Sequence, residues 1–267
     1  APAAAYRTLA DVEASRLPIV WLEPARVAFS PSVAAGAAER GLIDAELDAA
    51  LRTWGALACM RPMLVPSSLD TATVRVGFVD DWAARGFAVD AAGVTDVALA
   101  TDRDGGAVIT GAFIHLNAGF DWGAHPQDGT DGFRDLRALL VHELGHVLGL
   151  AHPCEPDEVG LACTPEHEDS AMHPIYRGSE QARLAADDVE GACALYPALA
   201  PAVVAPAEEA SRCERDDECS PGEWCLDDAC RRDLRYGGPC DRPQDCIGAR
   251  CLAGEARAAS LSGFRKG

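Results

Sequence analysis

The sequence has almost no lysine, no basic cluster and no apolar run long enough to cross a membrane. A membrane-spanning helix needs about 18 or more consecutive apolar residues, so no segment is expected to span a bilayer. Nucleic-acid binding requires basic side chains that neutralise phosphates, but 23 basic residues face 42 acidic ones and the net charge is -19. Nucleic acid is therefore not an expected partner, and the acidic surface should repel anionic membranes.

Cysteine, in contrast, is plentiful and unevenly placed. Seven of the 11 cysteines lie within residues 213–251. Such usage favours an oxidising compartment, and the sequence predicts a secreted or cell-surface protein, taken to be a monomer. The chain begins APAAAY without an initiator methionine. A mature product would begin this way after loss of its signal peptide, although a shortened chain would look the same.

Composition divides the chain into four parts. Residues 1–197 are predicted to form one domain with a sizeable core, and residues 198–211 form an Ala/Pro-rich linker. Residues 212–252 form a cysteine-rich module that needs disulfides to fold, and residues 253–267 form a short tail. The module lacks the Cys-x-x-Cys pairs of zinc modules. Its cysteine spacing, C-x5-C-x5-C-x4-C, recurs as C-x5-C-x4-C without a fourth cysteine. The odd number of cysteines leaves open a free thiol, an intermolecular bond or a truncated repeat.

Hydrophobic periodicity in the first part predicts an α+β domain built on a mixed, twisted sheet. Period-two alternation and β-prone residues predict strands at residues 26–30, 71–79, 97–101 and 112–117. Helical periodicity predicts amphipathic helices at residues 44–59, 131–149 and 184–196. The apolar stripe of the first helix is expected to lie on the sheet.

One segment carries recognisable chemistry: HELGHVLGLAH, residues 142–152. On a helix, His142 and His146 lie one turn apart on the same face, so both imidazoles can bind one metal ion. Gly149 permits a sharp turn that returns His152 as a third nitrogen ligand. Three imidazoles leave a fourth tetrahedral position for water, which distinguishes catalytic zinc from structural zinc. The pattern therefore predicts one catalytic Zn2+.

Glu143 is displaced by about 100° from His142 around the helix, so it reaches a water on the ion rather than the ion itself. Zinc is expected to lower the pKa of that water towards about 7 and to polarise a carbonyl group. Glu143 then takes the proton and delivers it to the leaving amine. The alternative, that these are ordinary core or surface histidines, is disfavoured because Gly149 and His152 make a chance match rare.

These residues resemble the metzincin metalloproteases, whose signature is His-Glu-x-x-His-x-x-Gly-x-x-His. Their Met-turn is matched by Met172 in SAMHPIY, and Met172, Pro174 and Tyr176 are similar to the matrixin branch. The segment RLAADDVEGACALY, residues 183–196, is similar to the final matrixin helix. Proline at position 153 instead resembles the serralysin branch, but the calcium-binding repeats of that branch do not follow in this sequence. The resemblance implies a zincin-like fold with an active-site helix and a Met-turn lower subdomain, and endopeptidase activity.

The resemblance also implies how a peptide substrate binds. The substrate would lie extended along an exposed edge strand, for which residues 97–101 are the candidate. A side chain after the cleaved bond would enter a pocket walled by Pro174 and Tyr176 and by the helix turn before His142. Ala138 lies in that turn, and its small side chain predicts a deep pocket for a large apolar residue.

The remaining histidines and two acidic turns are the other candidate metal ligands in the sequence. His115 and His125 lack the spacing of the second, structural zinc that the resemblance brings with it, so one zinc is predicted and His115 is expected at the surface or rim. His173 is expected not to be a ligand. The acidic turns at residues 102–106 and 128–132 offer oxygen ligands for Ca2+, but solvated turns explain them as well.

Four cysteines lie in the first part of the chain. Cys154 and Cys163 are close enough in sequence for a local bridge that would stiffen the rim of the cleft. Cys59 ends the first predicted helix and Cys193 lies in the last one, so a bridge between them would be long-range. In the loop-closure account it would stabilise the fold by about 4 to 5 kcal/mol.

Two functions remain at this point. The first is an exported zinc endopeptidase, with Asp187 and Asp188 tying the last helix to the Met-turn and the N-terminal segment. The alternative is a non-catalytic adhesion or binding protein that acts through its cysteine-rich module. The intact Glu143 favours the enzyme, because a non-catalytic protein has no need of a general base.

Overall fold

The computed structural model describes residues 6–31, 37–101, 106–123, 133–156 and 160–198, and five short strands between residues 224 and 262. His125, the acidic turns at residues 102–105 and 128–132, and the linker at residues 199–211 lie outside the described residues. The division of the chain into four parts therefore stays a prediction. Within the described part, no helix is both long and apolar enough to cross a membrane.

The main sheet is mixed, as predicted. Its order is β15-β6-β7-β5-β3-β4, with β2 paired to β7. The parallel strands are β2 (Val20–Trp21), β3 (Ala25–Phe29), β4 (Leu64–Pro66), β5 (Val74–Val79) and β7 (Ala107–Asn117). Two strands run antiparallel to their neighbours, β6 (Gly93–Thr101) and β15 (Arg257–Ser262). The four predicted strands are all present, and the strands predicted at residues 97–101 and 112–117 are longer than expected.

Smaller elements surround this sheet. Two-stranded sheets join β1 (Arg7–Thr8) to β10 (Leu150–Ala151) and β8 (Asp121–Gly123) to β9 (Phe133–Asp135). Within the cysteine-rich segment, β11 (Trp224–Leu226) pairs with β12 (Ala229–Arg231), and β13 (Cys246–Ile247) pairs with β14 (Arg250–Cys251). Short helical turns are α1 (Leu9–Val12), η1 (Trp82–Arg85), η2 (Pro165–His167) and η3 (Ser179–Ala182).

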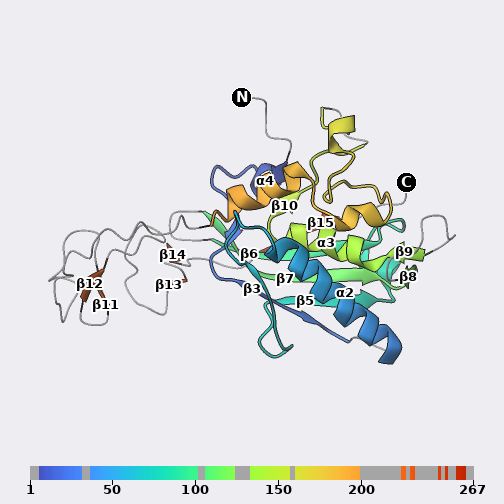
Figure 1. Ribbon diagram of the computed structural model, residues 1–267, viewed down its shortest axis with the longest axis horizontal. Helices are drawn as coiled ribbons and strands as arrows, with labels where there is room; N and C mark the ends of the chain where they lie inside the picture. Colours follow the sequence, from blue (N-terminus) through green and yellow to red (C-terminus); the bar gives the residue numbers. More distant parts are fainter. Residues whose placement is uncertain are drawn as a thin grey trace.

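Three longer helices complete the fold, and α2 (Ala37–Gly55) and α3 (Leu136–Val147) lie over the same face of the sheet (Figure 1). The predicted boundaries were partly wrong. Helix α2 begins earlier and ends at Gly55, before Cys59. Helix α3 begins at Leu136 rather than residue 131, because the Asp135 carboxylate accepts hydrogen bonds from the backbone N–H groups of Arg137 and Ala138 and so caps the helix. The third helix is α4 (Ala186–Leu195).

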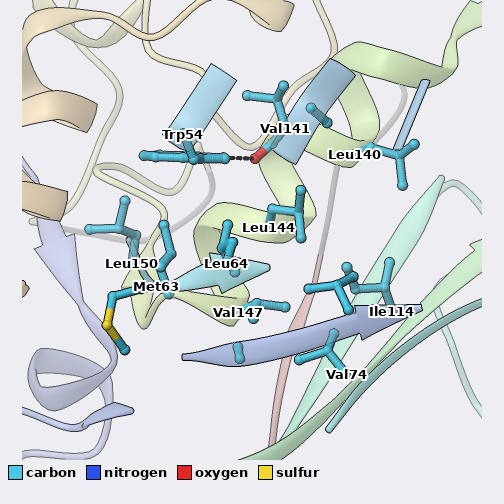
Figure 2. Packing of buried hydrophobic residues seen from close by; sticks show 14 of the residues in the cluster. Trp54, Met63, Leu64, Val74, Ile114, Leu140, Val141, Leu144, Val147 and Leu150 are labelled. Atoms are coloured by element: carbon cyan, nitrogen blue, oxygen red, sulfur yellow. Dashed lines mark hydrogen bonds between the residues drawn. The ribbon is translucent and has the colours of Figure 1, made fainter. Parts of the chain in front are cut away.

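Helix α3 is the centre of the core. Every residue of it except Arg137 is buried, as expected of a helix covered on all sides rather than on one stripe. Leu140, Val141 and Leu144 pack in the cluster shown in Figure 2. The indole N–H of Trp54 on α2 donates a hydrogen bond of 2.9 Å to the Val141 carbonyl (Figure 2). The apolar face of α2 is thereby fixed against the helix that carries the histidines.

Below α3, Asp188 on α4 holds the turn that contains Met172. Its carboxylate accepts hydrogen bonds from the Ser170 hydroxyl at 2.7 Å and from the Ala171 and Met172 N–H groups at 2.8 and 3.2 Å. The predicted tie between the last helix and the Met-turn is therefore confirmed for Asp188. Asp187 lies with Tyr6 of the N-terminal segment around one small pocket.

Two disulfides join these parts. Cys59, just beyond α2, is bonded to Cys193 in α4. Cys154 is bonded to Cys163 nine residues later. The bridges therefore link the segment after α2 to the last helix and close the loop that follows His152.

The edge of the sheet differs from expectation. Residues 97–101 belong to β6, but β15 pairs along the outer side of β6, so the predicted exposed edge is covered. An edge strand presents unpaired N–H and C=O groups to any extended segment that can reach it. Here that segment comes from residues 253–267, the part predicted only as a tail.

Candidate metal centre

The three histidines of the sequence motif come together in the structure. Their ligand atoms lie within 4.8 Å of one another, and all three side chains are buried. His142 and His146 project from α3, and His152 follows β10 directly. The reversal between them depends on Gly149, whose φ of 92° is left-handed and whose added Cβ would lie 2.9 Å from the Ile19 carbonyl oxygen.

A backbone or side-chain acceptor holds each ring from behind. The Nδ1 atom of His142 lies 2.8 Å from the Ala171 carbonyl oxygen, and that of His146 lies 2.9 Å from the Leu150 carbonyl oxygen. The Nδ1 atom of His152 lies 2.7 Å from a Glu155 carboxylate oxygen. Because Nδ1 faces an acceptor in each case, it carries the proton and leaves the Nε2 lone pair for a metal ion.

The donor set fits zinc. The Nε2 atoms of His142 and His152 are 3.2 Å apart, and two nitrogens that bind one tetrahedral Zn2+ at about 2.05 Å stand about 3.3 Å apart. Burial holds the pKa of the His142 imidazole well below its usual value, and the charges of His146 and His152 lower it further. A neutral imidazole is the form that binds a metal ion.

Glu143 lies beside this centre, fully buried on the side of β6. The Thr95 hydroxyl donates a hydrogen bond of 2.6 Å to its Oε2 atom. The backbone of β6 passes so close that a Cβ added to Gly93 would overlap Oε1. Burial raises the pKa of the Glu143 carboxyl to about 8, and the Thr95 hydrogen bond opposes that rise.

The turn with Met172 supports the centre from below. Met172 is buried, and its sulfur lies where a Cβ on Gly145 of α3 would be. The adjacent Ala171 carbonyl holds the His142 ring. The turn therefore fixes both the position of α3 relative to the Met-turn and the orientation of the His142 ring.

Of the residues predicted to wall a substrate pocket, Tyr176 and Ala138 lie at the start of α3. The Tyr176 hydroxyl accepts a hydrogen bond of 3.0 Å from the Asp135 N–H, directly before the helix. Pro174 is buried in the segment between Tyr176 and the Met-turn. Ala138 is fully buried one turn before His142. The pocket itself stays a prediction.

Two other histidines lie apart from the three. His173 accepts a hydrogen bond from the Ile175 N–H at Nδ1, and its ligand atoms group with Cys154 and Cys163, which already form a disulfide. The surface or rim position predicted for His115 was wrong. Its ring is buried, because it stacks on Phe113 and meets Asp96 at 3.0 Å across the sheet.

Sequence reasoning missed two residues at the centre. Glu155 follows His152 by three residues, so a search for acceptors near each histidine could have found it. Thr95 precedes Glu143 by 48 residues. Its role depends on the packing of β6 against α3, which no local pattern encodes.

Comparison with known proteins agrees with this geometry. The chain is 31% identical to matrilysin of Rattus norvegicus over 159 residues, which is 59% of this chain and 51% of that protein. It therefore spans about half the length of this relative. Residues 20–197 match the matrixin family, and this match takes in the three histidines, Glu143 and the turn with Met172. Because the match covers more than half of the sequence, the chain belongs to the matrixin family and has its zincin-like fold.

Proposed function

We propose that this chain is a zinc-dependent endopeptidase. The observation that carries the proposal is the cluster of three buried imidazoles with the Glu143 carboxyl group beside it. His142, His146 and His152 are the proposed ligands of one Zn2+. When bound, the ion supplies a Lewis acid that polarises a carbonyl group and makes water more acidic. Family membership supports the same reaction class.

Glu143 is the proposed general base and acid. The buried carboxylate takes a proton from the attacking water and delivers it to the leaving amine nitrogen. Thr95 holds one carboxylate oxygen, so the other is turned towards Gly93 and the neighbouring backbone of β6. A raised pKa suits a group that must accept and then release a proton near neutral pH.

The substrate is proposed to be an extended peptide that adds to the sheet along β6, at the edge with which β15 pairs in the structure. Main-chain hydrogen bonds would set its direction, and side-chain pockets would set its specificity. Ala138, Pro174 and Tyr176 are the proposed pocket residues for the side chain after the cleaved bond. The position of Tyr176 at the start of α3 supports this assignment.

Export of the protein is proposed on the two disulfides, Cys59–Cys193 and Cys154–Cys163. Such bonds persist in oxidising compartments. Calcium and a role for the cysteine-rich module stay outside this proposal, because residues 102–105 and 128–132 and most of that module lie outside the described residues.

A pair of variants tests the proposal. Glu143→Gln should lower kcat on casein or a quenched fluorescent peptide at least about a hundredfold, while it keeps one zinc per chain. His146→Ala should lose both zinc and activity. Zinc content by atomic absorption and turnover with and without a chelator are the measurements. Cleavage that survives complete zinc removal would overturn the proposal, and a fully metallated wild-type chain without any peptidase activity would favour the adhesion alternative.

A further inference from the structure

The outer edge of β6 is occupied by a segment from the opposite end of the chain. Strand β15 pairs antiparallel with β6 over six residues, from Arg257 opposite Leu99 to Ser262 opposite Val94. The pairing spans most of the length of β6. Without β15, β6 would be the last strand on that side of the sheet.

The pairing ends near Glu143, at the N-terminal end of β6. Leu261 is opposite Thr95, whose hydroxyl holds Glu143. Ser262 is opposite Val94, next to Gly93, whose backbone lies against the Glu143 carboxyl group. As β15 runs towards its C-terminal end, it therefore approaches the proposed general base.

The β15 sequence, RAASLS, suits a transient strand. Four of its six residues are alanine or serine, and none is proline. Main-chain hydrogen bonds dominate this mode of recognition, so an edge of this kind accepts many sequences. The same property allows one segment to exclude another from the edge.

We infer that Arg257–Ser262 is a built-in competitor that occupies the half of the substrate groove on the N-terminal side of the cleaved bond. The inference rests on the proposed peptidase function and identifies the resident occupant of its substrate strand. Peptide substrates bind only when β15 has left β6. The segment therefore raises the apparent KM and leaves kcat unchanged.

The expected size of the effect follows from effective concentration. A tethered segment meets its site at an effective concentration on the order of 1 mM. A six-residue strand with a dissociation constant of about 0.1 to 1 mM then raises KM on the order of two- to tenfold. Inhibition of this strength tunes activity without abolishing it.

Two proline variants in the full chain test the inference. Successive N–H groups of a strand point to opposite edges. Only one of the two variants, Ala258→Pro or Ala259→Pro, therefore removes a hydrogen bond to β6. Proline on the outward side of an edge strand is tolerated. We expect at least one variant to lower KM two- to tenfold, with kcat within a factor of two of the wild type. An unchanged KM in both variants would overturn the inference.

A second arm uses the peptide itself. Free RAASLS peptide, added at millimolar concentration to the proline variant with the lower KM, should restore the higher KM by competitive inhibition. The matched peptide with the corresponding proline should not compete. Loss of kcat instead of a rise in KM would show that the segment acts elsewhere and would overturn the inference.

Hydrogen exchange separates this inference from the proposed function. In the Glu143→Gln background, residues 94–99 of β6 should exchange more slowly in the parent chain than in the effective proline variant. This readout needs no turnover, so it tests the pairing even if peptidase activity is absent. Equal rates of hydrogen exchange in the two proteins would overturn the inference without affecting the zinc peptidase proposal.

Discussion

The two oxygens of the Glu143 carboxyl group lie in different surroundings. Oε2 accepts a hydrogen bond from Thr95, whereas Oε1 lies against Gly93 with no hydrogen-bond partner among the described residues. A hydroxyl donor favours the ionised carboxylate, and burial favours the protonated acid. The balance between the two sets the fraction of Glu143 that is ionised and so available for its proposed role as a base.

Replacement of Thr95 tests this balance. Thr95→Val keeps the shape of the side chain but removes the donor, so the pKa of Glu143 should rise further. We expect kcat to fall on the order of tenfold, and the acidic limb of the kcat/KM profile should move to higher pH, with zinc content and KM unchanged. Thr95→Ser keeps the hydroxyl and should restore most of the activity. A serine variant as impaired as the valine variant would point to packing rather than to the hydrogen bond.

For single residues, the sequence predicted those contacts that form between residues close together in the chain. The spacing of His142, His146 and His152 sets their approach, because a helix turn and one left-handed glycine suffice to bring them together. Thr95 could not be predicted, because its contact with Glu143 requires β6 and α3 to be packed in one particular register.

Among the elements, α3 carries a glycine where helix propensity would favour alanine. Gly145 lies directly over the Met172 sulfur and against Trp54. Gly145→Ala gains about 1 kcal/mol of helix propensity but forces the Met-turn away, so we expect a net loss of about 1 to 3 kcal/mol of stability. Zinc affinity should fall as well, because the turn carries the Ala171 carbonyl that holds His142.

Gly41 in α2 is the matched control. No atom lies within 4 Å of a Cβ added there, so Gly41→Ala should stabilise the protein by up to about 1 kcal/mol. Urea unfolding of both variants and a zinc competition assay provide the comparison. Equal stability changes at the two positions would show that the Met-turn does not press on α3.

The link between α4 and the Met-turn predicts a dependence on pH. Burial raises the pKa of Asp188 to about 6, the charge of Asp187 adds to the rise, and hydrogen bonds from Ser170, Ala171 and Ala185 oppose it. The folded state therefore binds this proton more tightly than the unfolded state. Its stabilising contribution is complete below about pH 4 and is lost as the pH rises through about 6.

Asp188→Asn removes that titration. The unfolding free energy of the wild type minus that of the variant should fall by up to about 3 kcal/mol between pH 4 and pH 7, since burial raises the pKa of Asp188 from 3.8 to about 6. Denaturant unfolding of both proteins across this range, with metal removed, measures the difference. A difference that stays constant with pH would contradict the assignment.

Element boundaries were harder to predict than element types. Periodicity located α2 and α3, but Asp135 rather than an earlier residue caps α3, so residues 133–135 form β9 instead of a helical turn. β15 could not be anticipated, because a short run of alanine and serine acquires its strand only from the edge of β6.

Across the whole molecule, strand pairing determines which segments of the chain lie beside the candidate metal centre. Sequence alone predicted a mixed sheet and a tie between the last helix and the N-terminal segment, but not the strand pairings that bring both ends of the chain close to the candidate metal centre. Arg7 in β1 pairs with Ala151 in β10, next to the proposed ligand His152. Arg257–Ser262 pairs with β6. Such long-range pairings follow from global packing, which local periodicity does not contain.

The two disulfides should contribute unequally at this scale. Cys59–Cys193 closes a loop with a sequence separation of 134, whereas Cys154–Cys163 closes one of 9. Since loop-closure entropy grows with the logarithm of loop length, the first should stabilise the fold by about 5 kcal/mol and the second by about 2.5 kcal/mol. The long bridge also connects the segment after α2 to the helix that holds the Met-turn.

Paired alanine substitutions measure this difference. Cys59→Ala with Cys193→Ala should lower the unfolding free energy about twice as much as Cys154→Ala with Cys163→Ala, in denaturant titrations of zinc-loaded protein. Because α4 supports the Met-turn through Asp188, loss of the long bridge should also speed zinc release. Equal losses of stability in the two pairs would mean that native packing, rather than the restriction of the unfolded chain, sets the contribution of each bridge.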